Sequence, residues 1–213
     1  MTVTLVDHMG SDLSVVNAAR VSFAKVHEEF DEGSDSKLIR YLAKHDHWSP
    51  FGHASLQFHI KAPVFVARQL VKHQVGLTWN EVSRRYVDME PEFYAPKVWR
   101  GVAENKKQGS SEEEININPR NDMVDDYQKV LSTAKWTYEE LLRKGVCPEQ
   151  ARMVLPQSMM TEWYWSGTLY AFARVCNLRC KDDAQKETQD VGWNIDRHAR
   201  KLFPASWLAL RNA

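Results

Sequence analysis

The densest group of polar side chains in this sequence lies in residues 69–85, QLVKHQVGLTWNEVSRR. Arginine and lysine occur there beside a serine, and guanidinium groups donate hydrogen bonds to phosphate oxygens in pairs. The stretch therefore has the residue types of a phosphate-binding site. A solvated charged turn has the same residue types, and the residues alone leave that alternative open. The side chains concerned belong to Lys72, His73, Gln74, Asn80, Glu81, Ser83, Arg84 and Arg85.

Two other kinds of site are weaker hypotheses. Residues 45–47 (His-Asp-His) and His53 have side chains that bind metals, but their spacing matches no established zinc motif, so we expect no metal. Ser83 could be a nucleophile with His73 as its base. No G-x-S-x-G turn surrounds Ser83, however, and the sequence has no Rossmann or P-loop glycine fingerprint.

The apolar pattern predicts the elements that must position these side chains. Leu56, Phe58 and Ile60 alternate with polar residues, so residues 54–62 are predicted to form a half-buried strand. After Pro63 the period changes to that of a helix. A continuous helix there would place Gln69 and His73 on one face, and Arg68 and Lys72 on one face.

The remaining elements follow from the same reasoning. The chain order of strands and helices favours an α+β fold: a single domain over residues 1–213, with a central, mainly antiparallel sheet flanked by helices, plus a helical portion. Residues 89–119 are rich in proline, glycine and charge, which predicts a long surface loop. The other predicted elements are a strand over residues 2–6 and helices over 11–20, from about 36, 121–144, 158–177 and 183–202, with Pro204 after the last.

Composition excludes several classes of protein. The chain has 213 residues, 43% of them hydrophobic, which is enough for one domain with a core. Lys plus Arg (28) equals Asp plus Glu (28), so we expect no nucleic-acid partner. The mean hydropathy of -0.52 and the first ten residues predict neither a membrane span nor a signal peptide, hence a cytoplasmic protein. Its three cysteines suggest no disulfide framework, and we interpret Cys176 and Cys180 as core residues.

The polar stretch resembles the motif of the flavin-dependent thymidylate synthases. That family has Arg-His-Arg, seven residues and then Ser, in a pattern that ends Asn-Glu-x-Ser-x-Arg-Tyr. Here Lys72-His73-Gln74 is followed by eight residues and Ser83, and residues 80–86 (NEVSRRY) match the ending in full. Further similar segments occur in family order at residues 18–23, 47–69, 151–156 and 178–187.

The sequence departs from the family pattern at several positions. Lys72 and Gln74 replace the two motif arginines, and one extra residue lies between Gly76 and Asn80. Thr168, Tyr170 and Arg174 stand where the family usually has Asn, Arg and Asn for flavin contact. The expected flavin contacts are therefore rearranged relative to the family.

The resemblance implies an enzyme that converts dUMP to dTMP, with methylenetetrahydrofolate as carbon donor and NADPH as reductant through FAD. Arg179 would stabilise negative charge on the pyrimidine and Ser83 would hold the substrate. It implies dUMP contacts from Gln69, Lys72, Glu81, Val82, Ser83, Arg84, Arg85, Arg152 and Arg179. It implies FAD contacts from Ser22, Ser49, Lys72, His73, Gln74, Val75, Asn80, Glu81 and Arg174, and a folate or NADPH region at His47 and Tyr86.

The family also implies a homotetramer whose active sites are shared between subunits. None of the three cysteines lies in the motif region, so the cysteine nucleophile of the other thymidylate synthase class is not expected. Two alternatives remain open: a flavin oxidoreductase of the same fold without methyl transfer, and a non-catalytic nucleotide-binding protein.

Overall fold

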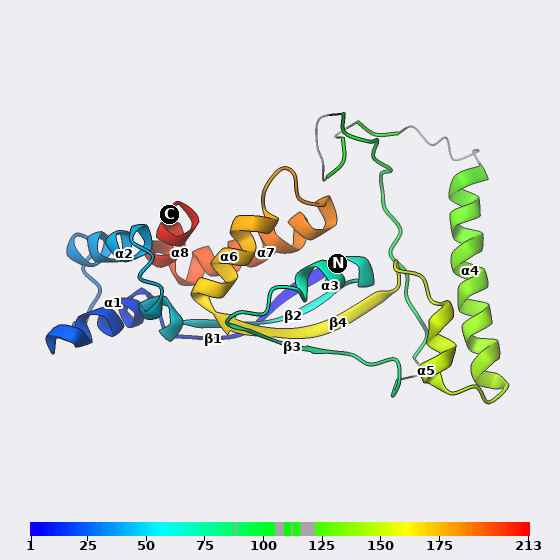
Figure 1. The fold of residues 1–213 in the computed structure, drawn as a ribbon, viewed down its shortest axis with the longest axis horizontal. Coiled ribbons are helices and arrows are strands. Elements are labelled where there is room, and N and C mark those ends of the chain that lie inside the picture. Colours follow the sequence, from blue (N-terminus) through cyan, green and yellow to red (C-terminus); the bar gives the residue numbers. More distant parts are fainter. Residues whose placement is uncertain (88, 105–108, 112, 116–121) are drawn as a thin grey trace.

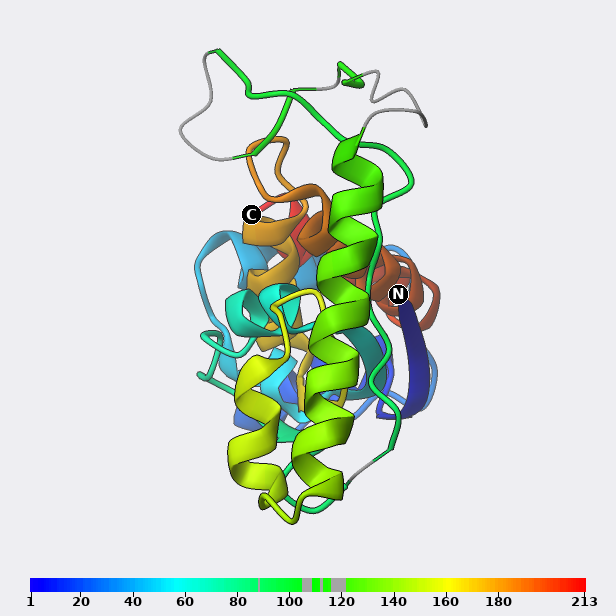
Figure 2. The same cartoon turned by 90° about the vertical axis from the view of Figure 1, so that its right-hand side faces the viewer.

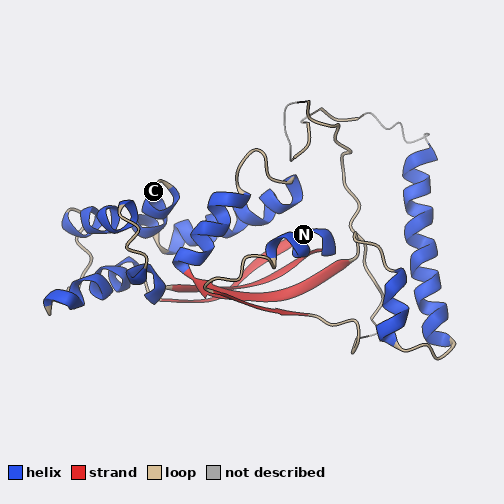
Figure 3. Cartoon of the chain, in the orientation of Figure 1, coloured by secondary structure: helices blue, strands red, loops and turns tan. Residues whose placement is uncertain are grey.

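The computed structural model of the chain describes residues 1–87, 89–104, 109–111, 113–115 and 122–213. Within these residues, four strands form one antiparallel sheet in the order β1-β2-β4-β3, and helices lie along one of its faces (Figures 1 and 3). The predicted α+β class with a central antiparallel sheet is confirmed. The strands are β1 (Thr2–Met9), β2 (Ser55–Pro63), β3 (Leu77–Glu81) and β4 (Met160–Thr168).

The helices surround this sheet on one face and at both ends. The α-helices are α1 (Asp12–Arg20), α2 (Ser34–Lys44), α3 (Val64–Leu70), α4 (Asp122–Arg143), α5 (Pro148–Ala151), α6 (Leu169–Arg179), α7 (Lys186–Leu202) and α8 (Pro204–Arg211), and the short 3-10 helices are η1 (Val21–Phe23), η2 (Ser49–His53) and η3 (Arg152–Val154). Figure 2 shows α4 and α5 side by side, and Figure 1 shows that they lie at the end of the sheet opposite α1 and α2. No helix in the described ranges is long and apolar enough to cross a membrane.

The buried face of the sheet is aromatic. Alternate side chains of β2 and β4 point into the core, where Phe58 and Trp165 lie opposite each other and are completely buried. Both rings contact Phe172 of α6 edge-on, with ring centroids 5.2 and 5.3 Å apart. Aromatic burial of this size is a major source of stability, so the Phe172 contacts fix α6 against the sheet.

The strand predicted near the start of the chain, the half-buried strand β2, and the helices α1, α2 and α4 are all present. Their periodicities are regular, and Ser11 stands in extended conformation before α1, as a helix-capping residue does. Cys176 and Cys180 are buried in the core, as predicted.

The predicted helix over residues 158–177 is wrong in its first half, which forms β4. Trp163 and Trp165 are buried whereas Tyr164 is exposed, so this segment has the period of a strand. Pairing with β2 on one side and β3 on the other satisfies its backbone groups. The helix begins only at Leu169, where the Thr168 hydroxyl accepts a hydrogen bond from the Ala171 amide at 3.1 Å.

The helix after Pro63 is shorter than predicted. It ends at Leu70, and Lys72 and His73 lie in a turn. The expectation that Gln69 and His73 share one helix face, and that Arg68 and Lys72 share one, is therefore wrong. The chain then reverses at Gly76, whose φ of +76° suits glycine, and enters β3, which the sequence did not predict. A side chain at Gly76 would also meet the Ala171 side chain at 3.0 Å.

Two boundaries late in the chain also differ. The helix predicted from residue 183 begins at Lys186, and Pro204 starts α8 instead of only following a helix. In the predicted loop 89–119, the described residues contain no helix or strand, only isolated bridges from Phe93 to Met159 and from Arg100 to Glu114. Residues 105–108, 112 and 116–119 of that loop lie outside the described residues.

Candidate functional site

Arg179 is the last residue of α6, and its half-buried guanidinium is held by the end of α3 and the turn that follows it. Its Nε donates a hydrogen bond to Nε2 of His73 at 2.9 Å. Its Nη2 donates to the backbone carbonyl of Gln69 at 3.3 Å. Burial lowers the pKa of Arg179 from its ordinary value, but an arginine stays charged at any working pH. The turn thus fixes a cation whose hydrogen-bond acceptors are neutral.

This guanidinium faces a cavity of about 720 Å³ that is strongly basic. Five of the lining side chains are cations and none is a carboxylate, which suits a phosphate or another anion. The lining residues are Phe65, Arg68, Gln69, Lys72, Arg100, Gly109, Ser110, Gln157, Arg179, Gln185 and Lys186. The cavity therefore brings together three of the predicted dUMP contacts, namely Gln69, Lys72 and Arg179.

A hydrogen-bond network behind the cavity supports its wall. The Gln69 side chain bonds to Gln185 and accepts from the Thr188 hydroxyl at 3.2 Å. Gln185 in turn donates to Glu187 at 3.1 Å, and Arg100 pairs with Glu187 at 2.7 Å. The buried Glu187 carboxylate is satisfied by these donors, which offset the effect of burial and hold its pKa below the ordinary value.

His73 is neutral at physiological pH. Burial is the main cause, and the nearby charges of Arg179 and Arg174 add to it, so the pKa of His73 falls to about 4. Because Nε2 accepts the Arg179 hydrogen bond, the ring proton is on Nδ1.

The Ser83 hydroxyl interacts with Arg85 and not with His73. Its oxygen is 3.3 Å from both the backbone amide and the Nε of Arg85. The idea of a Ser83 nucleophile with His73 as base receives no support from this geometry.

The other predicted dUMP contacts lie around a second cavity, of about 330 Å³. Glu81, Val82, Arg84 and Arg152 line it, and Gln157 lines both cavities. Ser83 and Arg85 follow on the same turn and line neither cavity. The predicted dUMP residues are therefore divided between two openings of a single chain.

Most of the predicted flavin contacts are exposed, and one group of them lies near the start of α6. The loop containing Gln74 and Val75 lies there, because the amide of Thr168 donates to the Gly76 carbonyl at 3.1 Å. Tyr170, one of the family departures, donates its hydroxyl to Asp46 at 2.6 Å. Its ring also contacts that of Trp48, with centroids 6.4 Å apart. The exposed residues among the predicted flavin contacts are Ser22, Ser49, Lys72, Gln74, Val75, Asn80, Glu81 and Arg174, and His73 is half-buried.

The two residues predicted for a folate or NADPH region are exposed as well. His47 lies in a ring cluster with Tyr41 and His45, with its centroid 5.9 Å from that of Tyr41. Tyr86 is 79% exposed and has the Arg85 guanidinium 5.1 Å from its ring centroid. These side chains present flat surfaces to solvent, but they do not share a cavity with Arg179.

Sequence reasoning missed several residues of the basic cavity. Arg68 is next to the motif and was noted only for its helix face. Arg100, Ser110 and Gln157 come from segments with no motif, and Lys186 was not predicted although it lies in the family-like segment 178–187. Their position depends on how the loop after β3 and the start of α7 fold against α3. Only the excess of cations around one opening, visible in three dimensions, identifies them.

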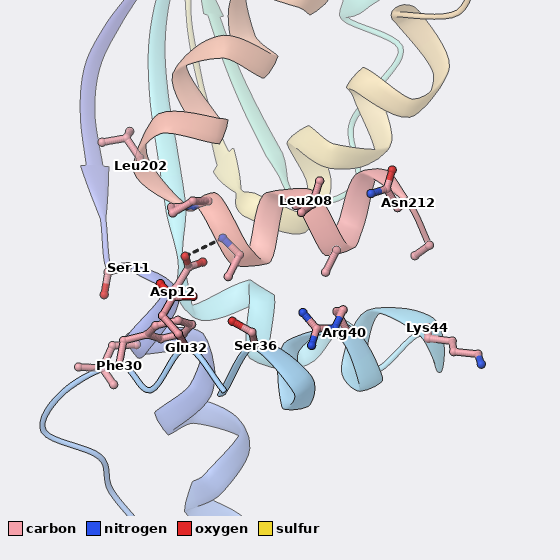
Figure 4. A pocket seen from close by; sticks show the side chains of 15 residues that line it. Ser11, Asp12, Phe30, Glu32, Ser36, Arg40, Lys44, Leu202, Leu208 and Asn212 are labelled. Atoms are coloured by element: carbon pink, nitrogen blue, oxygen red, sulfur yellow. Dashed lines mark hydrogen bonds between the residues drawn. The ribbon is translucent and has the colours of Figure 1, made fainter. Parts of the chain in front are cut away.

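Two further regions do not form competing sites. Within the described part of the chain, no group of three or more His, Cys, Asp or Glu residues could hold a metal. A cavity of about 840 Å³ lies between α2 and α8 (Figure 4), and it contains none of the predicted site residues. Asp12 at its edge is engaged in capping α8, accepting from the amides of Ala205 and Ser206 at 2.9 and 2.8 Å.

Comparison with known proteins identifies the family of the chain. The family model described as "Thymidylate synthase complementing protein" matches residues 4–205. The chain is 38% identical over 212 residues to a flavin-dependent thymidylate synthase of Thermus thermophilus, covering 97% of this chain and 74% of that protein. It is 39% identical over 207 residues to one of Thermotoga neapolitana, covering 97% and 89%.

A solved structure is similar over almost the whole chain. This is the crystal structure of a UMP/dUMP methylase, PolB from Streptomyces cacaoi, bound with 5-Br dUMP. The TM-score is 0.88 at 33% identity, and the match covers 99% of this chain and 94% of that one. The resemblance seen in the sequence is thereby confirmed, and the chain belongs to the flavin-dependent thymidylate synthase family.

Proposed function

We propose that this chain catalyses the reductive methylation of dUMP to dTMP, with methylenetetrahydrofolate as carbon donor and NADPH as reductant through bound FAD. The observation that supports it best is the basic cavity around Arg179, found in a member of this family. A nucleoside monophosphate has a dianionic phosphate and a polarisable uracil ring, so it suits an opening with cations and no carboxylate.

In this proposal the protein binds and polarises the substrate. Lys72 and Arg68 bind the phosphate, and Gln69 orients the nucleotide. Arg179 stabilises negative charge that develops on the pyrimidine, because its guanidinium is fixed before the substrate arrives. Ser83 positions the nucleotide. Glu81, Val82, Arg84 and Arg152 complete its binding from the second opening, and Arg85 does so from the turn beside it.

The residues around the start of α6 fit a flavin. The exposed ring of Trp48, the half-buried ring of Tyr170 and the exposed cation of Arg174 provide stacking surface and charge for a large, flat, anionic group. The flavin supplies the redox chemistry, which no side chain of the protein can supply. The residues proposed to hold it are Ser22, Ser49, Lys72, His73, Gln74, Val75, Asn80, Glu81 and Arg174, with His47 and Tyr86 toward folate or NADPH.

The proposal includes a homotetramer with shared active sites, acting in the cytoplasm. The division of the dUMP residues between two openings supports it. In a tetramer, a second chain would bring the residues of its smaller cavity to the basic cavity of the first chain. Exposed apolar side chains near the proposed flavin site also support it: Phe23 and Val75 are 76% and 75% exposed. Light scattering should give about four times the chain mass of 24.7 kDa. An active monomer would contradict the shared site.

A second candidate is methylation of UMP. The similar protein PolB is described as a UMP/dUMP methylase, and its structures hold 5-Br dUMP and 5-Br UMP. The two substrates differ by one hydroxyl, so a site that accepts dUMP can admit UMP when space is left at that position.

One experiment separates these functions. Purified protein is examined for flavin absorption in the visible range, and then incubated with NADPH, methylenetetrahydrofolate and either dUMP or UMP. Formation of dTMP supports the main proposal, and methylated UMP supports the second. A yellow protein that oxidises NADPH at the same rate with and without either nucleotide indicates a flavin oxidoreductase. Nucleotide binding without flavin indicates a non-catalytic protein.

A further inference from the structure

Arg179 differs from three other half-buried arginines, Arg20, Arg100 and Arg211, in what it bonds to. Each of these three pairs with a buried carboxylate: Arg20 with Asp35 at 2.7 Å, Arg100 with Glu187 at 2.7 Å and Arg211 with Asp196 at 2.8 Å. Arg179 bonds to an imidazole nitrogen and a backbone carbonyl. Its position is fixed, but its positive charge is not cancelled.

We infer that His73 is a positioning residue for Arg179, a neutral acceptor that orients the guanidinium and leaves its charge available to the substrate. This inference rests on the proposed function, in which Arg179 stabilises a developing negative charge. It assigns His73 a role beyond flavin contact and explains why a histidine, and not an acid, serves at this place.

The geometry leaves the rest of the guanidinium free for a ligand. An arginine has five N–H groups, and here Nε–H and one Nη2–H are engaged. In the described part of the chain no hydrogen bond from Nη1 to another residue is formed, and Arg179 lines the basic cavity. The contacts with Gln69 of α3 and with His73 of the following turn therefore leave the remaining donors of Arg179 available to an anion in this cavity.

The environment of His73 keeps it neutral. A protonated imidazole could not accept from Arg179 and would repel it. Burial and the charges of Arg179 and Arg174 prevent this, since they lower the pKa of His73 to about 4. An acceptor with a negative charge would hold the guanidinium equally well, but it would form an ion pair and weaken the attraction of Arg179 for the substrate.

Two variants of equal length separate orientation from charge. The side-chain oxygen of His73→Gln can take the place of Nε2 as a neutral acceptor, whereas His73→Glu offers a charged one. We expect kcat for dTMP formation to be at least tenfold lower in His73→Glu than in His73→Gln. The thermal midpoint of His73→Glu should be at or above that of His73→Gln, because the buried cation gains a partner, so misfolding would not explain the loss.

Repeating both substitutions in an Arg179→Ala background shows whether His73 acts through Arg179. The difference between the two variants should vanish there, in residual rate and in thermal midpoint. Equal activity of His73→Gln and His73→Glu, or a difference that persists without Arg179, would overturn the inference. Flavin absorption of each variant is a further check. The inference would also be overturned if both variants lost flavin to the same extent and the difference between them were the same with and without Arg179.

Failure of the proposed function can be told apart from failure of this inference. A parent protein that makes no dTMP would overturn the function. The thermal-midpoint comparison needs no turnover, and it would still support or overturn the pairing of His73 with Arg179.

Discussion

Arg179 and His73 are 106 positions apart in the sequence, and the Nε of the first donates to the Nε2 of the second at 2.9 Å. This contact joins the end of α6 to the turn after α3, so two distant segments define one wall of the basic cavity. The chemistry of the site depends on that junction.

Replacing Arg179 by alanine should abolish most of the turnover. Losing a fixed charge stabiliser typically costs about 3 to 4 kcal/mol of transition-state stabilisation, or roughly a hundredfold or more in kcat. Steady-state rates at saturating dUMP measure this, with retained flavin colour and oligomeric state as checks. Arg143→Ala is a matched control, because Arg143 pairs only with Glu140 on the exposed face of α4. A rate for Arg179→Ala within about tenfold of the parent would remove Arg179 from the mechanism.

The stability of the native protein should fall as the pH drops below neutrality, partly because of His73. Its pKa is about 4 in the folded state and 6.5 ordinarily, so the unfolded state binds the extra proton first. The destabilisation begins as pH falls below about 6.5 and is complete near pH 4. Allowing for the half-exposed ring, we expect it to amount to about 1 to 2 kcal/mol. Urea unfolding of the parent and of His73→Gln at pH 7 and pH 4.5 measures this, and parallel pH dependences would contradict it.

Two inactive variants should complement each other when mixed. Arg179 and Arg152 line different cavities of one chain, so in the proposed tetramer they reach one site from different subunits. If Arg179→Ala and Arg152→Ala chains are unfolded together and refolded, about a quarter of the sites regain both arginines. Activity should rise well above that of either variant refolded alone. Without such a rise, both arginines serve their site from the same chain.

Restoring the two motif arginines should strengthen flavin binding. Lysine offers a point charge and glutamine none, whereas arginine donates in pairs to phosphate oxygens. Lys72→Arg combined with Gln74→Arg is expected to lower the Kd for FAD by about tenfold, as measured by titrating FAD into flavin-free protein. Lys129→Arg on α4 is the control, because its ammonium is at the surface beside Asp126. Unchanged or weaker affinity would indicate that the extra residue before Asn80 moves these side chains away from the phosphates.

Removing the carboxylate of Asp12 should destabilise the whole fold and leave the activity of the site unchanged. This buried side chain caps α8 through two backbone amides, and an N-cap substitution costs about 1 to 2 kcal/mol. Chemical denaturation of Asp12→Ala should show this loss while kcat stays unchanged. The exposed Asp7, which accepts only from the neighbouring amide of His8, provides the control. Equal stability of the Asp12→Ala and Asp7→Ala variants would show that the cap is not needed.

The sequence predicted those elements whose pattern is local. Strand β2 and helix α4 have regular periods, so they could be identified from residue spacing. Strand β4 could not, because its nine residues are followed directly by a helix and its tryptophans suit either element. Its identity is decided by pairing with β2 and β3. Likewise the motif indicated Lys72 and Arg179, whereas Arg100 and Lys186 reach the cavity only through tertiary folding.

The central position of β4 has a consequence for how the chain folds. Its partner strand β2 is far away in sequence. The hydrogen bond between Gln57 of β2 and Ser166 of β4 joins residues that are 109 positions apart. Such a closure loses more entropy than a hairpin, and pairings of this kind slow folding. Until it forms, β2 has a free edge and an uncovered apolar face, both of which can associate with another chain. The time before β4 joins the sheet is therefore the period in which newly made protein is most prone to aggregate.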